Sequence, residues 1–241
     1  MSTWRYPRLI AHRCGGALAP ENTLAGLRIA ARLGVKAVEF DVMLSGDGVP
    51  FVIHDETLER TSNGSGRVAD TPAADLGALD VGAWHHAAFA GERLPTLAAA
   101  LALCDSLGLA VNLEIKPSAG HEAVTGSTVA ALAAACTPHA GLILSSFSPA
   151  ALAAAAELAP ELPRALLVEE IPTDWPRRLA SLGCSALHAW AQKLNRDLAS
   201  AVIAAGVPLA CYTVNQPAEA EALFALGVSA VFSDRPDLLL T

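Results

Sequence analysis

The stretch 37-AVEFDVMLSGDGVPFVIHD-55 decides how the chain folds. Its first half is an apolar strand that carries Glu39 and Asp41 on one face, because residues two apart in a strand point the same way. Asp47-Gly48 is a strong signal for a two-residue hairpin turn. A hairpin closed symmetrically about that turn places His54 opposite Asp41, where cross-strand neighbours share a face. The stretch therefore predicts a hairpin that gathers two carboxylates and an imidazole.

Short β-rich segments alternate with Ala- and Leu-rich helical segments on both sides of this stretch. Thr96 and Ser148 are good N-terminal helix caps, and glycines such as Gly34 and Gly227 follow helical segments, where a left-handed residue is favoured. These signals predict strands at Leu9–Arg13, Ala37–Val42, Ala110–Lys116, Gly141–Phe147, Arg164–Glu169, Ala186–Trp190, Leu209–Asn215 and Val228–Asp234. They predict helices at 22–33, 96–107, 121–136, 149–159, 174–182, 195–205 and 217–226.

Eight strands that alternate with helices in 241 residues indicate an α/β fold, the TIM (β/α)8 barrel. Pro50–His54 is a further β-rich segment, but no helix precedes it, so we interpret it as the return arm of a hairpin. Residues 43–95 then form a hairpin and insertion after the second strand, in a single domain over 1–241. A doubly wound open sheet is the alternative. It is less favoured because Cys14-Gly15-Gly16, after the first strand, is no dinucleotide-binding turn.

The bulk composition argues against several classes of protein. The net charge of −8 disfavours a nucleic-acid or anionic-membrane surface. Five widely spaced cysteines without a CxxC motif indicate reduced thiols in a cytoplasmic protein. No apolar run reaches about 18 residues, so no membrane span is expected. The first eight residues lack the apolar core of a signal peptide.

Charged side chains collect at the expected carboxyl ends of the first three strands, which is where TIM barrels place their active sites. Because consecutive barrel strands are neighbours, groups from these ends can converge. The first strand ends in His12 and Arg13, the second carries Glu39 and Asp41, and the third ends in Glu114 and Lys116.

This combination suits a phosphodiester and a hard cation. Carboxylate donors indicate Mg²⁺ or Ca²⁺ rather than zinc. One divalent cation, three carboxylates, two basic side chains and a phosphodiester together balance to neutrality. His12 and His54 are available as acid and base, because an ordinary imidazole titrates near neutral pH.

With these residues in this order, the chain resembles the glycerophosphodiester phosphodiesterase family. The resemblance is closest to the bacterial cytoplasmic enzymes that accompany glycerol-3-phosphate uptake. Each shared motif is short, but together they follow the family order through nearly the whole chain. The motifs are Ala11–Arg13, Ala19–Thr23, Glu39–Asp41, His54–Asp55, Leu58–Gly64, Leu113–Pro117, Leu144–Phe147, Tyr212–Asn215 and Ser233–Asp234.

The resemblance implies a TIM barrel with an insertion after the second strand. It implies metal-dependent hydrolysis of glycerophosphodiesters to sn-glycerol 3-phosphate and an alcohol, with one divalent cation as cofactor. The roles it implies are metal ligation by Glu39, Asp41 and Glu114, acid/base catalysis by His12 and His54, phosphate binding by Arg13 and Lys116, pocket lining by Tyr212, and a site-adjacent, orienting role for Glu21.

Some residues depart from the family pattern or stay outside it. Cys14 stands where the family usually has glycine, and a thiol beside the metal suggests sensitivity to thiol reagents. Polar residues expected around 187–193 are partly replaced by Ala and Trp, which puts the shape of the alcohol pocket in question. His188 is the remaining histidine worth testing. Trp84 and Phe89 are expected in a small core of the insertion, with an aromatic lid contact as the alternative.

Two other functions stay open. A lysophospholipase D-type activity on the same barrel would need an apolar or membrane-facing surface. A non-catalytic binding barrel would have no need of two acid/base histidines. The choice between Mg²⁺ and Ca²⁺, the head-group preference, the order of the two histidines, direct water attack against a cyclic phosphate, and the oligomeric state are left undecided.

Overall fold

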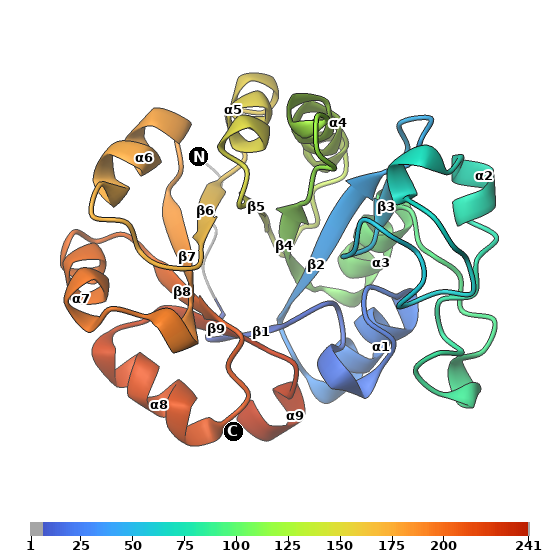
Figure 1. The fold of residues 1–241 in the computed structure, drawn as a ribbon. Helices are drawn as coiled ribbons and strands as arrows, with labels where there is room; N and C mark the ends of the chain where they lie inside the picture. Colours follow the sequence, from blue (N-terminus) through green and yellow to red (C-terminus); the bar gives the residue numbers. More distant parts are fainter. Residues whose placement is uncertain (1–6, 241) are drawn as a thin grey trace.

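The strands of the protein close into a ring. The computed structural model describes residues 7–240. The prediction that the first eight residues carry no signal peptide therefore falls mostly outside the described residues. Within that range β1 (Leu9–Ala11) pairs in parallel with both β2 (Ala37–Leu44) and β9 (Ala230–Ser233). The helices surround the ring (Figure 1). This closure confirms the TIM barrel and rules out the open sheet.

The seven predicted helices agree with the structure to within two residues at each end, whereas the strand predicted at Leu209–Asn215 ends three residues earlier, at Tyr212. The other barrel strands are β4 (Ala110–Ile115), β5 (Leu142–Ser146), β6 (Arg164–Val168), β7 (Ala186–Trp190) and β8 (Leu209–Tyr212). The helices around the barrel are α1 (Leu24–Leu33), α3 (Leu97–Leu107), α4 (Glu122–Ala135), α5 (Pro149–Leu158), α6 (Trp175–Leu182), α7 (Arg196–Ala204), α8 (Pro217–Leu226) and α9 (Pro236–Leu239).

Local signals account for this agreement. Thr96 and Ser148 accept hydrogen bonds from the first turns of α3 and α5, as predicted. Gly34 and Gly227 end α1 and α8 in the left-handed region. In the part of the chain that the structure describes, no helix is long and apolar enough to cross a membrane.

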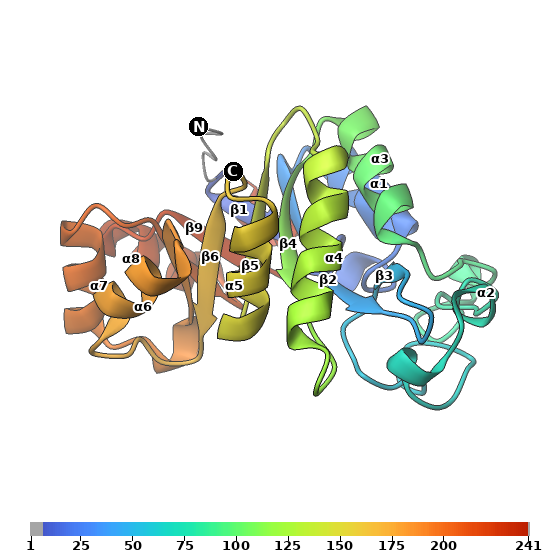
Figure 2. The ribbon, with the colours of Figure 1, turned by 90° about the horizontal axis from the view of Figure 1, so that it is seen from above.

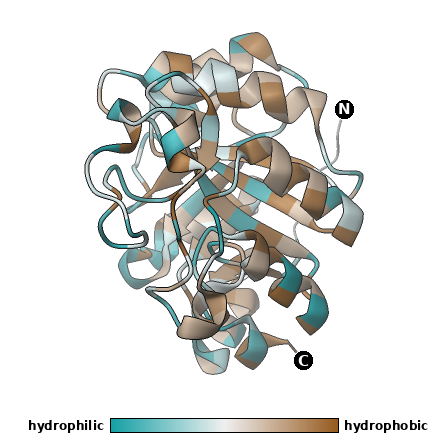
Figure 3. Cartoon of the chain, turned by 90° about the vertical axis from the view of Figure 1, so that its right-hand side faces the viewer, coloured by the Kyte–Doolittle hydropathy of each residue, from teal (hydrophilic) through white to brown (hydrophobic). Residues whose placement is uncertain are grey.

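The barrel interior is filled near the amino ends of its strands and hollow near their carboxyl ends. Small side chains dominate the filled layer, which leaves the inner space to polar residues further along the same strands. The layer contains Ile10, Ala37, Ala110, Ala210, Ala230 and Phe232. In Figure 3 the strands are mostly brown, whereas much of the loop structure of the insertion is teal or white.

The hairpin after β2 forms, but its register differs by one residue from the prediction. Val42 pairs with Val52 of β3 (Pro50–Val52), and the Ile53 amide donates to the Asp41 carbonyl at 3.0 Å. The prediction that His54 lies opposite Asp41 is therefore wrong. The cause is a three-residue loop, closed where the Ser45 amide donates to the Val49 carbonyl at 2.9 Å, with Gly48 at φ 83°.

The insertion packs beside β2 and β3 (Figure 2). It has a hydrophobic core of its own. Trp84 and Phe89 do not belong to this core, so that expectation is wrong, and the Trp84 side chain is 42% exposed. Trp84 instead lines a hollow that it shares with His12 of the barrel. The short helices are η2 (Val68–Asp70), α2 (Ala73–Leu76) and η3 (Ala87–Phe89), and the core residues are Met43, Phe51, Ile53, Leu58, Val68, Leu76, Val81 and Leu94.

Candidate active site

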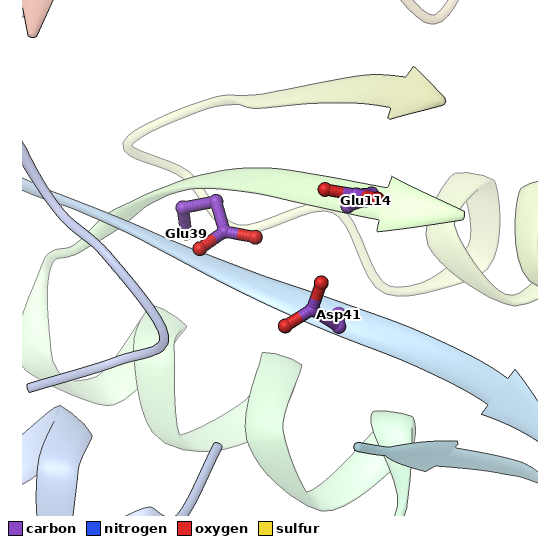
Figure 4. Close-up of side chains that lie close together, drawn as sticks. All are labelled: Glu39, Asp41 and Glu114. Atoms are coloured by element: carbon purple, nitrogen blue, oxygen red, sulfur yellow. The ribbon is translucent and has the colours of Figure 1, made fainter. Parts of the chain in front are cut away.

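Three carboxylates meet inside the carboxyl end of the barrel. Glu39 and Asp41 lie on β2, and Glu114 lies on β4 directly beside Asp41 in the parallel register. One oxygen of each lies within 4.8 Å of the others (Figure 4). Glu39 and Asp41 are almost completely buried. The prediction that Glu39 and Asp41, two residues apart in the strand, share one face is therefore correct.

The cluster is short of positive charge. Burial and repulsion from Asp41 raise the pKa of Glu114 to about 8, and burial likewise raises the pKa of Glu39 well above its ordinary value. Burial would raise the pKa of Asp41 too, but the charges of His54, Lys116 and Arg13 lower it. Within residues 7–240, Glu39 Oε1 is buried without a hydrogen-bond partner. An all-oxygen donor set of this kind fits a divalent hard cation.

The segment before α1 holds two of these carboxylates in place. The Arg13 amide donates to Glu39 Oε2 at 2.8 Å. Asn22 Nδ2 donates to Asp41 Oδ2 at 2.9 Å, and its Oδ1 accepts from the Asp41 amide at 3.2 Å. Arg13 and Asn22 have φ values of 49° and 58°, uncommon for residues other than glycine. The orienting role of Asn22 was missed, although Asn22 lies in the Pro-Glu-Asn-Thr motif.

His12 lies in the turn after β1 rather than in the strand. The predicted strand to Arg13 was too long, because the left-handed conformations of Arg13 and Cys14 end the extended chain. His12 Nδ1 lies 2.6 Å from Asp234 Oδ1, and its Nε2 lies 3.9 Å from Glu39 Oε2. Asp234 was quoted in a motif but given no role from the sequence, because 222 residues separate it from His12.

His54 enters the site from the turn after β3. Its Nε2 lies 2.9 Å from Lys116 Nζ, and its Nδ1 lies 2.6 Å from Asp55 Oδ1. An ammonium group only donates, so Nε2 is the acceptor and Nδ1 carries the proton that is donated to Asp55. Burial lowers the pKa of His54, and the charges of Arg13 and Lys116 add to this effect. The hydrogen bonds to Lys116 and Asp55 fit the neutral form of the ring.

Arg60, from the insertion, connects the carboxylate partners of Arg13 and His54. Its Nη1 and Nη2 donate to the two oxygens of Glu21 at 2.8 and 2.7 Å, and its Nε donates to Asp55 Oδ2 at 2.5 Å. Glu21 also accepts from Arg13 Nη1 at 3.1 Å. Thr23 caps α1, so Glu21 orients Arg13 rather than capping the helix. Glu21 was predicted to be an orienting residue from the sequence, whereas Arg60 stands in the Leu58–Gly64 motif and was given no role.

Replacing Arg60 with Ala is expected to lower kcat/KM about 10- to 100-fold, as is typical when a supporting hydrogen-bond partner is lost. Arg60→Lys should restore little, because one ammonium cannot reproduce the planar fork that engages Glu21 and Asp55. Steady-state kinetics should show the loss in both kcat and KM, because Arg60 supports a histidine and Arg13. Arg67→Ala is the matched control, as Arg67 is an exposed arginine of the same insertion paired with Glu56. Equal activity of the Arg60→Ala and Arg67→Ala variants would contradict this role.

A cavity of about 280 Å³ opens beside the carboxylates. The predicted site residues His12, Arg13, Glu39, Asp41, His54, Glu114, Lys116 and Tyr212 all line it, whereas Glu21 lies behind Arg13. Tyr212 contributes its ring, because its hydroxyl donates to the Val168 carbonyl at 2.8 Å. The remaining lining residues are Asn112, Phe147, Leu167, Trp190, Thr213 and Phe232.

Two residues singled out in the sequence lie away from the reacting groups. His188 is completely buried against Phe232, with ring centres 5.1 Å apart, and burial lowers its pKa to about 3. Cys14 packs into the core between barrel and helices, and burial raises the pKa of its thiol well above the ordinary value. Burial and the raised pKa both disfavour the reactive thiolate, which argues against the suggested sensitivity through Cys14.

Comparisons with known proteins extend over nearly the whole chain. The glycerophosphoryl diester phosphodiesterase family profile matches residues 12–238. A glycerophosphodiester phosphodiesterase of Caldanaerobacter subterraneus is 32% identical over 234 residues, 96% of each chain. A solved Oleispira antarctica phosphodiesterase, in complex with the product sn-glycerol-3-phosphate, is 40% identical with a TM-score of 0.94, covering 97% of this chain and 95% of that chain. An Agrobacterium tumefaciens glycerophosphodiester phosphodiesterase is 28% identical with a TM-score of 0.79, covering 97% and 99%.

Proposed function

The chain belongs to the glycerophosphoryl diester phosphodiesterase family, and we propose that it hydrolyses glycerophosphodiesters to sn-glycerol 3-phosphate and an alcohol with the help of one divalent cation. The observation that carries the proposal is the pair of carboxylate-supported histidines, His12 and His54, which face a buried group of three carboxylates. The product bound to the Oleispira antarctica relative supports the choice of substrate.

Glu39, Asp41 and Glu114 are the residues that would hold the cation, Mg²⁺ or Ca²⁺. When bound, the cation supplies Lewis-acid activation of the phosphoryl group. Arg13 and Lys116 line the same cavity and would bind the non-bridging phosphate oxygens. Lys116 also offsets part of the carboxylate charge, since its Nζ lies 3.8 Å from both Asp41 Oδ1 and Glu114 Oε1.

His54 is the better general base of the two histidines. Its neutral ring can accept a proton at Nε2 while Asp55 holds Nδ1. In the substrate-free structure Nε2 faces Lys116, and a phosphodiester anion would compete for this ammonium group and free the nitrogen. His12, held by Asp234, is then left to protonate the leaving alkoxide.

The substrate is a small molecule, and residues 1–241 act as one domain. A cytoplasmic location agrees with the five cysteines, all of which are free thiols in the structure.

A turnover assay tests the function. The protein is incubated with glycerophosphocholine, glycerophosphoethanolamine or glycerophosphoglycerol, and sn-glycerol 3-phosphate is measured with a coupled dehydrogenase. We expect release of sn-glycerol 3-phosphate from at least one diester, and no release of inorganic phosphate from the phosphomonoester glycerol 2-phosphate. Absence of turnover with all three diesters, at added Mg²⁺ and at added Ca²⁺, would refute the proposal.

A further inference from the structure

We infer that Asn112 determines substrate specificity by receiving a hydroxyl group of the substrate at the inner end of the cavity. The inference rests on the proposed function, because it concerns the same cavity. It adds a residue and a ligand chemistry that the charged groups of the site do not provide.

Asn112 completes a square of polar residues on two neighbouring strands. It lies on β4 two residues before Glu114, so both side chains point into the barrel. In the parallel register Glu39 is beside Asn112, as Asp41 is beside Glu114. Three corners of this square carry carboxylates, and the fourth carries a neutral amide.

The amide is buried and only partly satisfied. Asn112 is 1% exposed, and its Nδ2 donates to the Ser145 hydroxyl at 2.9 Å. Its Oδ1 has no hydrogen-bond partner among residues 7–240, and the side chain lines the cavity. Buried polar atoms are nearly always paired in folded proteins. An unpaired one that borders a cavity therefore indicates a partner that arrives with the ligand.

A hydroxyl group is the partner that fits. It can donate to Oδ1, and it would also pair with the amide in the flipped orientation, because a hydroxyl both donates and accepts. An anionic group is excluded by the neighbouring Glu39. Arg13 and Lys116 supply the charges for the phosphate instead. The apolar side chains of Leu167 and Phe232 line the same cavity and suit the carbon chain of a polyol.

The consequence is selection for an alcohol with a hydroxyl group near the phosphate. An analogue without that hydroxyl would leave a buried amide unpaired, which weakens binding by about 10- to 100-fold. Asn112 would thus distinguish glycerol from an alkyl group of the same length, independently of the metal ligands.

Binding of two products tests the inference without requiring catalysis. Dissociation constants of sn-glycerol 3-phosphate and n-propyl phosphate are measured by calorimetry at a fixed divalent-cation concentration. The wild type should prefer sn-glycerol 3-phosphate about 10- to 100-fold. Asn112→Leu should bring the ratio close to one, mainly by weakening sn-glycerol 3-phosphate. Asn112→Ala provides the same measurement if the leucine variant does not fold.

Ile143→Val is the matched control, because Ile143 is the β5 neighbour of Asn112 in the register and does not line the cavity. It should keep the wild-type ratio. An unchanged ratio in folded Asn112 variants would overturn the inference, including the case in which a water molecule satisfies the amide. If the wild type hydrolyses glycerophosphocholine but shows no preference, the inference alone fails. If it neither hydrolyses the diester nor binds sn-glycerol 3-phosphate, the proposed function fails.

Discussion

Replacing Glu114 with Gln is expected to lower kcat/KM for a glycerophosphodiester about a thousandfold, because several kcal/mol of cation-dependent stabilisation depends on the three carboxylates. The change keeps the shape of the side chain and removes its negative charge. Treatment of the wild type with EDTA should abolish activity to a similar extent, and addition of Mg²⁺ or Ca²⁺ should restore it. The variant should need a higher concentration of the cation for half-maximal activity.

Glu157→Gln is the control for this prediction. This substitution makes the same chemical change at Glu157, which lies on the exposed surface of α5 and does not line the cavity. The Glu157 variant should retain wild-type activity and wild-type dependence on the cation. If wild-type protein remains fully active after exhaustive chelation, and Glu114→Gln behaves like Glu157→Gln, then the three carboxylates do not hold a catalytic cation.

Replacing His54 with Ala is expected to lower kcat/KM about 10²- to 10⁴-fold, the usual contribution of a general base. The pH profile gives a second readout. The structure lowers the pKa of His54 below its ordinary value of 6.5, so the neutral, active form persists to lower pH. The wild type should therefore keep its kcat/KM through neutral pH. It should lose activity only below pH 6.5, as His54 takes up a proton.

The His54→Ala variant should lack this acidic limb. His121→Ala is the control, because His121 is an exposed histidine at the start of α4 and its loss should leave both rate and pH profile unchanged. A wild-type profile whose acidic limb survives in His54→Ala would assign the titration to another group and contradict the role of His54 as base.

Much of the fold and site could be predicted because the relevant signals are local. Alternation in the second strand placed Glu39 and Asp41 on one face, and helix caps such as Thr96 set element boundaries. The count of strands then separated the hairpin from the barrel. Each of these signals acts over a few residues, so it can be recognised without knowing what packs against it.

The sequence by itself thus determined the barrel, the three carboxylates and the two histidines. Only the tertiary structure decided how those groups are supported. The hairpin register depends on how the Ser45–Val49 loop closes, and the partnership of His12 with Asp234 spans 222 residues. Arg60 reaches Glu21 only because the insertion packs beside the segment that precedes α1. Such contacts depend on the relative positions of separate elements. Packing and backbone conformation set these positions, and no local sequence pattern indicates them.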